Sequence, residues 1–210
     1  RASEVLKRYP KINSRAFLMI GFPKESYRQI MDTINVAKKM DMDWNYITPL
    51  QPLPNTPVFD DMVEDNLAGT EAFGDIKYFV GGGYSSISSG SKSSNPLQND
   101  FLEIFKDKDL DDVPGPNEIK IIWAFMNYYL NFERLLRENV KEKIEQNYRW
   151  MNYVSDVVAK NDPIAIYYKM LMHKKFKGFS NEEDLKKFQS ITENSVTWKN
   201  NINQLGLFKI

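Results

Sequence analysis

Two short segments carry residues suited to holding a small ligand. Residues 17–25, FLMIGFPKE, end an apolar run with Gly21, Pro23 and the carboxylate of Glu25. Residues 49–60, PLQPLPNTPVFD, follow a second apolar run and are rich in proline. Glycine lets a flat ligand approach the backbone, and a carboxylate at a helix start can accept hydrogen bonds from free N–H groups. The pattern therefore predicts a binding site, and we identify no catalytic residue in it.

The sequence contains few residues that could bind a metal or act as a thiol. Cysteine is absent, which excludes disulfides, thiolate zinc sites and an iron–sulfur cluster held by this chain's own thiolates. His173 is the one histidine and stands beside Lys174, so no histidine pair can bind a metal. The triple glycine at residues 81–83 lacks the Lys-Ser/Thr of a phosphate-binding loop and reads as a linker. We predict no metal site.

The elements that would position the two segments alternate between helix and strand. Residues 15–22, RAFLMIGF, form a nearly continuous apolar run, which predicts a strand buried on both faces of a parallel sheet. Residues 25–40 have helical spacing, and residues 44–50 are aromatic and β-branched, which favours a second strand. Because parallel strands end at one edge of a sheet, Gly21–Pro23 and Pro49–Gln51 should lie together there.

The rest of the chain is predicted to be mostly helical. A Gly- and Ser-rich stretch at residues 78–95 suggests three parts, a β/α unit over 1–77, a linker with a short helix over 78–113, and a helical domain over 114–210. Asp162 and Pro163 predict the start of one helix, and Ser180 with Glu183 reads as a capping box for a last helix to about Asn203. The many helical aromatics favour packing between helices over stacking on nucleobases, because the surrounding charge is balanced.

Composition narrows the classes of partner. Lys and Arg together number 28, as do Asp and Glu, so the net charge is zero and a nucleic-acid partner is not expected. No apolar stretch is long enough to span a membrane and no signal peptide is visible, so we expect a cytoplasmic protein. The chain begins with Arg1 in a helical pattern, from which we expect a piece of a longer protein.

The two segments together resemble part of a known enzyme family. FLMIGFPKE resembles the fifth barrel strand of radical S-adenosylmethionine (SAM) enzymes, which ends in a Gly-aromatic/aliphatic-Pro-Gly-Glu motif. PLQPLPNTPVFD is similar to their sixth strand and the Pro-aliphatic-Pro-Gly-Thr-Pro segment after it, as in cobalamin-binding and methylthiotransferase-like members. The resemblance covers roughly residues 1–66. It departs from the pattern at Lys24 and Asn55, where the family has glycine and where the turns call for positive φ.

The resemblance implies a fold and a set of site residues. The fold would be α/β, the last two β/α units of a partial (β/α)6 barrel followed by a mostly α-helical C-terminal domain. One side of the SAM adenine pocket would be formed by a set of residues at the ends of the two strands: Ile20, Gly21, Phe22, Pro23, Glu25, Leu50 and Gln51.

The resemblance also implies cofactors and partners that this chain does not contain. The intact parent would bind SAM and a 4Fe-4S cluster, with cobalamin left open, and would act on a small-molecule substrate. Without the family's CxxxCxxC cysteines the chain alone would be inactive, so its partner is the missing N-terminal part of the same polypeptide.

Two other interpretations remain open at this point. The helical tail could be a protein-interaction module with a structural β/α remnant. Alternatively, the chain could belong to another β/α barrel enzyme whose late strands end in Gly-Phe-Pro. That interpretation would require catalytic carboxylates at strand ends, and Glu25 is the sole candidate there.

Overall fold

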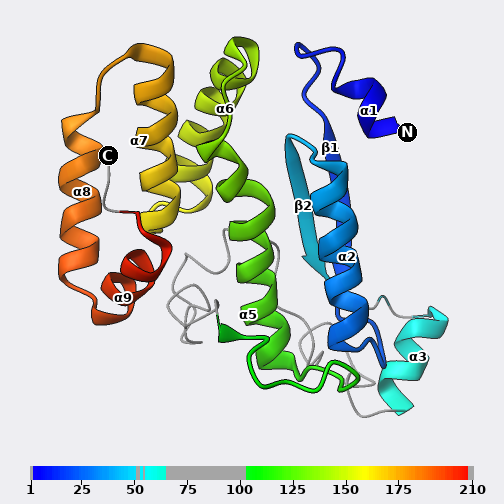
Figure 1. Cartoon of the computed structure of the whole chain (residues 1–210). Coiled ribbons are helices and arrows are strands. Elements are labelled where there is room, and N and C mark those ends of the chain that lie inside the picture. The colour runs from blue at the N-terminus through cyan, green and yellow to red at the C-terminus, as the bar shows by residue number, and fades with distance from the viewer. Residues whose placement is uncertain (1, 51–52, 54, 65–102, 208–210) are drawn as a thin grey trace.

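A computed structural model describes residues 2–50, 53, 55–64 and 103–207 of the chain. Its first part has the predicted order of helix, strand, helix and strand (Figure 1). The bounds of these elements, with the short helix that follows, are α1 Ala2–Leu6, β1 Arg15–Ile20, α2 Tyr27–Met40, β2 Trp44–Pro49 and α3 Pro57–Glu64. The predicted boundary at residues 77/78 and the Gly/Ser-rich stretch lie outside the described residues.

The two strands form a parallel pair. Arg15 is in register with Trp44 at one end, and Ile20 with Pro49 at the other. The Leu50 N–H extends the pairing by donating to the Ile20 carbonyl at 2.7 Å. Adjacent, same-direction strands with their ends together are therefore confirmed. The described residues contain no further strand, and the barrel itself stays a prediction.

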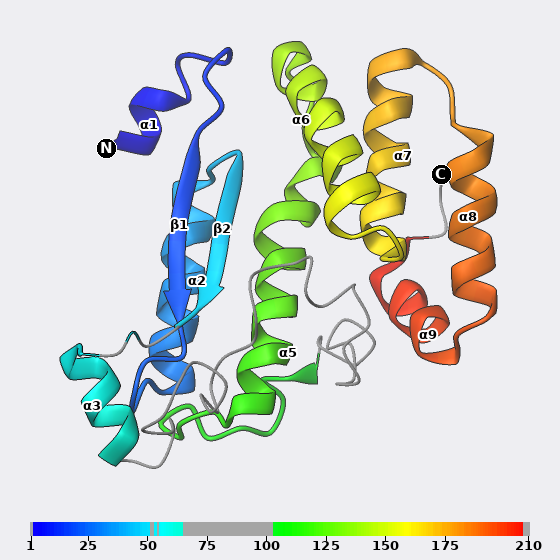
Figure 2. The same ribbon diagram turned by 180° about the vertical axis from the view of Figure 1, so that it is seen from behind.

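One face of the sheet is covered along its length, and the other is covered only at the start of the strands, where Trp44 is buried against Phe132 and Trp150. Helix α2 packs against the face that carries Leu18 and Ile20, and Ile20 is fully buried. On the other face Phe17 is 81% exposed and Met19 is 45% exposed. In Figure 2 no described element lies in front of the later half of β1. The prediction that β1 is buried on both faces is therefore wrong for this chain, because no described element covers Phe17 and Met19.

The outer edge of β2 is closed by a helical segment that runs on without a break through three helix types. This segment consists of α5 Pro116–Met126, the π-helix η3 Asn127–Phe132 and the 3₁₀-helix η4 Glu133–Leu136. The Trp123 Nε1–H donates to the Ile47 carbonyl at 2.7 Å. The Asn131 amide bonds to both backbone groups of Asn45, which lie on the same edge. A helix thus takes the place of a further strand at this side of the sheet.

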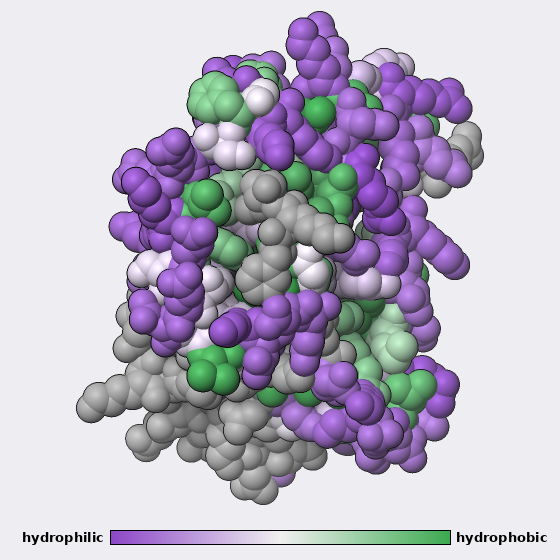
Figure 3. Space-filling view, turned by 60° about the vertical axis from the view of Figure 1, so that its left-hand side comes forward, coloured by the Kyte–Doolittle hydropathy of each residue, from purple (hydrophilic) through white to green (hydrophobic). Residues whose placement is uncertain are grey.

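The remaining helices pack beside this segment, and of these α6 also contacts the start of the sheet through Trp150, which packs on Trp44 (Figures 1 and 2). They are α6 Lys141–Tyr153, the π-helix η5 Val154–Val158, α7 Pro163–Lys177, α8 Glu182–Glu193 and α9 Val196–Leu205. Phe132 stacks on Tyr168 of α7 with ring centroids 5.4 Å apart, and both rings are buried, as the packing interpretation predicts. Viewed from the α8 side, the surface is mainly hydrophilic, with small separate hydrophobic patches (Figure 3).

Capping explains where the late helices start and stop. Asp162 caps α7 by accepting a hydrogen bond from the Ile164 N–H at 2.8 Å, as predicted. The predicted capping box at Ser180 and Glu183 is wrong, because Asn181 is the residue that accepts from the first free N–H groups of α8. The predicted last helix is also two helices, since Ser195 caps a new start at Val196.

Candidate functional site

The turn after β1 gathers most of the predicted site residues. Gly21 is buried and has φ +83°, a conformation that glycine adopts without steric cost. Lys24 has φ +61°, so the turn needs a left-handed residue at the position where the family pattern has glycine. Asn55 has φ +65°, so the second departure from the pattern also stands at a left-handed position. Both expectations of positive φ are confirmed.

Glu25 holds this turn together. Its Oε2 accepts hydrogen bonds from the N–H groups of Gly21 at 2.5 Å and Phe22 at 3.1 Å. Burial raises the pKa of Glu25, and these two hydrogen bonds lower it by less. The cap of α2 is Ser26, in a capping box with Gln29, so the helix begins at Tyr27 rather than at Glu25. Glu25 thus fixes the loop before the helix.

The side chains at the two strand ends differ in exposure. Ile20 and Leu50 are buried in the core, so they would face a ligand through their backbone. Phe22 is 42% exposed and Pro23 is half-buried. Gln51 lies outside the described residues. The described part of the predicted site therefore offers one exposed aromatic ring beside a glycine backbone.

The open face of the sheet leads to these strand ends. Phe17 stacks on Tyr46 across the two strands, with ring centroids 5.0 Å apart. Odd-numbered residues of β1 share this face, so Met19 lies next to Phe17 on the side toward the turn. Arg15, at the start of β1, contacts the Tyr46 hydroxyl and lies over the Trp150 ring at 4.5 Å. Sequence analysis missed this exposed aromatic face, since an apolar run alone cannot show which side is covered.

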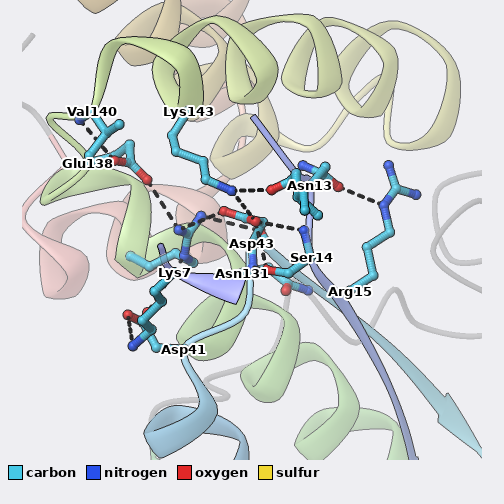
Figure 4. A network of polar contacts seen from close by, with 12 residues as sticks. Lys7, Asn13, Ser14, Arg15, Asp41, Asp43, Asn131, Glu138, Val140 and Lys143 are labelled. Atoms are coloured by element: carbon cyan, nitrogen blue, oxygen red, sulfur yellow. Dashed lines mark hydrogen bonds and ion pairs between the residues drawn. The ribbon is translucent and has the colours of Figure 1, made fainter. Parts of the chain in front are cut away.

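The opposite end of the strands is held by a buried ionic network (Figure 4). Asp43 accepts hydrogen bonds from Ser14 and from the Lys143 ammonium at 2.5 Å. Arg134 donates to the Asp43 carbonyl and to Glu138. Burial alone would raise the pKa of Asp43, but the hydrogen bonds from Lys143 and Ser14 and the Lys143 charge together outweigh it and lower the pKa. The network joins α6 and η4 to the beginnings of β1 and β2, so it serves stability.

The helix α2 is anchored near the turn by residues that follow the undescribed stretch. The N–H groups of Tyr27 and Arg28 donate to the carbonyls of Asp112 and Leu110. The Arg28 guanidinium also forms two bonds with the Asp111 carboxylate, at 2.8 and 3.2 Å. The end of the predicted linker is therefore fixed against the first turn of α2.

The described residues do not fit an iron–sulfur cluster. The chain has no cysteine, and the described part holds no group of three His, Asp or Glu side chains that could bind a metal ion. We derive no step through the cluster. A flat ligand fits better, because Gly21 and Phe22 present backbone and ring at the shared edge of a parallel sheet.

Comparison with known proteins gives one partial match. A 58-residue segment is 34% identical to the tRNA-2-methylthio-N(6)-dimethylallyladenosine synthase of Sulfurihydrogenibium sp. (strain YO3AOP1). The match covers 27% of this chain and 13% of that protein. No family model and no solved structure matches the chain. In the described part, no helix is long and apolar enough to cross a membrane.

Proposed function

We propose that this chain is the late part of the catalytic barrel of a radical SAM enzyme, followed by a helical tail on the substrate side. The observation that carries the proposal is the 2.7 Å bond from the Leu50 N–H to the Ile20 carbonyl. It brings the ends of two parallel strands together at one edge, where β/α enzymes build their sites. The similarity to a methylthiotransferase supports the same family.

The two edges of the sheet differ, and this difference supports the proposal that β2 is the last strand of such a barrel. The β2 edge is closed by Trp123 and Asn131, whereas β1 pairs only with β2 in the described part of the chain. Further strands would therefore be added on the β1 side. They would also cover the exposed Phe17 and Met19. In the proposal these strands come from the preceding part of the same polypeptide.

The proposed site residues act on the adenine side of SAM. Phe22 would pack against the adenine, Gly21 would allow its close approach, and Glu25 would keep both in position through its two hydrogen bonds. Bound SAM and a 4Fe-4S cluster supply radical chemistry when the parent provides the cysteines. Cobalamin is not part of the proposal, because neither the described residues nor the matched relative points to it. The substrate is not assigned beyond the small molecule that the sequence analysis expects.

The alternative of an independent helical interaction module has less support. Trp123 and Asn131 bond directly to the backbone of β2, so the helical tail and the sheet share one structure. A third possibility, a barrel enzyme that uses carboxylates at strand ends, would need Glu25 to be free. Its carboxylate instead accepts two backbone hydrogen bonds.

The intact parent provides the test. We expect its upstream sequence to hold three clustered cysteines, and the purified protein to contain iron and cleave SAM. The variant Phe22→Ala should raise the KM for SAM and leave the iron content unchanged. Phe179→Ala is the control, because Phe179 is exposed near the far end of α7. A complete upstream barrel without the cysteines, or equal effects of the two variants, would overturn the proposal.

A further inference from the structure

A pocket of about 470 Å³ lies at the end of the sheet opposite the proposed site. It is open to solvent on one side and is lined by the last turn of α2, by η3 and η4, and by the chain just after α1. Its size is within the range of pockets that bind small molecules. The walls are charged rather than apolar, so a polar ligand would suit it.

Positive charge exceeds negative charge in this pocket. Five cationic side chains and two carboxylates line it: Lys7, Lys38, Lys39, Arg134, Arg137, Asp41 and Glu138. Both carboxylates already have partners, since Asp41 pairs with Lys7 at 3.0 Å and Glu138 pairs with Arg134 at 3.2 Å. Lys39 and Arg137 pair with no carboxylate among the residues that the structure describes. These two cations are available to an anion.

Two buried polar atoms in the pocket walls lack a hydrogen bond within the described part of the chain. They are the Arg134 Nε, which is a donor, and the Asn45 Oδ1, which is an acceptor. The nearest carboxylate oxygen to Arg134 Nε is on Asp41 at 3.9 Å, beyond hydrogen-bonding distance. Buried polar atoms of this kind are normally satisfied by protein, water or ligand. Because both atoms have almost no accessible surface, a ligand with one acceptor and one donor would satisfy them once the pocket walls move apart.

We propose that this pocket binds a small phosphorylated compound that also carries hydroxyl groups. Lys39 and Arg137 would hold the phosphate, since ammonium and guanidinium groups are the usual phosphate ligands. A hydroxyl oxygen would accept from Arg134 Nε, and a hydroxyl hydrogen would be donated to Asn45 Oδ1. Lys38 lies over the Tyr129 ring at 3.7 Å and fixes one wall.

Helix ends account for only part of this charge. Lys38 and Lys39 stand in the last turn of α2, where cations compensate the helix dipole. Arg137 plays the same role at the C-cap of η4. A helix end has a charge equivalent of about one half, so two ends do not balance an excess of three. Compensation of the helix dipoles also does not supply hydrogen-bond partners for Arg134 Nε and Asn45 Oδ1.

Binding can be tested on the chain itself with ribose 5-phosphate as the probe. We expect saturable shifts of the Tyr129 and Leu130 amide signals in NMR, with a Kd of roughly 0.1–1 mM. Ribose and inorganic phosphate, each with half of the recognised groups, should bind about tenfold more weakly, a loss of about 1.4 kcal/mol each. A short RNA oligonucleotide serves as a further arm, and tighter binding of RNA than of ribose 5-phosphate would overturn the small-ligand proposal.

Charge reversal separates the pocket from general attraction of anions. The double variant Lys39→Glu with Arg137→Glu should weaken binding of ribose 5-phosphate at least about tenfold. The control Lys187→Glu changes an exposed lysine on α8 and should leave the Kd unchanged. Circular dichroism would verify the fold of each variant. Unsaturable shifts in the unchanged chain, or equal weakening by pocket and control variants, would show that the pocket holds only water.

Discussion

The side chain of Asn131 pairs with the backbone of Asn45 as a neighbouring strand would. Its Oδ1 accepts from the Asn45 N–H at 2.8 Å, and its Nδ2 donates to the Asn45 carbonyl at 3.0 Å. Asn127, one turn earlier, accepts a further hydrogen bond from the Asn131 amide. The pair satisfies the edge of β2 in a buried position.

Replacing Asn131 should reveal how much this pairing contributes. The change Asn131→Ala leaves the buried N–H and carbonyl of Asn45 without a partner, so the free energy of unfolding should fall by about 2–4 kcal/mol. Urea denaturation measures the difference. Asn203→Ala, at an exposed position on α9, should have little effect. A loss as small as that of the control would show that water replaces the amide.

Asp43 should be equally sensitive to replacement. The change Asp43→Asn removes the negative charge that compensates the nearly buried Lys143 and Arg134, and should destabilise the fold by about 3 kcal/mol or more. Asp41→Asn is a matched control, because the Asp41–Lys7 pair is half exposed and surface pairs contribute about 0–1 kcal/mol. Thermal unfolding of both variants makes the comparison, and similar losses would contradict the network's role.

The raised pKa of Glu25 predicts a pH dependence. Between the ordinary value of 4.5 and the raised value, the unfolded chain has lost the proton and the folded chain has kept it. The contribution of Glu25 to stability is therefore fully present below pH 4.5 and is lost as the pH rises through the raised pKa. Glu25→Gln should remove this part of the pH profile. An NMR titration of the carboxyl group at or below 4.5 would contradict it.

Replacing Lys24 by glycine, the residue at this position in the radical SAM pattern, should stabilise the chain. Lys24→Gly relieves a left-handed backbone at φ +61°, and should stabilise the chain by about 0.5–1 kcal/mol after the entropy cost of glycine. The same change at Lys186, within α8, should cost about 1 kcal/mol. Opposite signs in urea denaturation are the expected result. Destabilisation at both positions would show that Lys24 makes a contact that outweighs the strain.

The proposed function predicts that replacing Phe17 has different effects on stability in this chain and in the proposed parent enzyme. In the chain alone Phe17→Ser removes mainly the stack on Tyr46, so the loss should stay within about 1 kcal/mol. In the proposed parent enzyme the added strands would bury the ring, and the same change should cost about 3 kcal/mol. Equal losses in the two proteins would mean that nothing covers this face.

Local sequence patterns predicted where helices and strands form. They did not predict which elements pack against them. RAFLMI specified a strand, and Asp162-Pro163 specified a helix start, because strand propensity and capping depend on neighbouring residues. The open face at Phe17 could not be read, since apolar residues do not say what covers them. The split between α8 and α9 was missed because Ser195 was not recognised as a cap.

The turn after β1 was predicted for the same reason, and its role as a binding site stays a prediction. The sequence pattern put Gly21 and Glu25 in one turn, and in the structure the Gly21 N–H donates to the Glu25 carboxylate. The closure of β2 depends on Asn131 at a distance of 86 residues. A signal was nevertheless present, because two asparagines four positions apart in an apolar helix, Asn127 and Asn131, indicate a polar partner for that stripe.

The long separation between Asn45 and Asn131 has a consequence for synthesis on the ribosome. Until Trp123 and Asn131 have emerged, 76 residues after Ile47 and 86 residues after Asn45, the outer backbone groups of the strand Trp44–Pro49 lack these two partners. A nascent chain stopped before that point presents an unprotected edge, which invites association with other nascent chains. Production of truncated forms should therefore be limited by aggregation up to Asn131, and should recover once the helix that carries it is included.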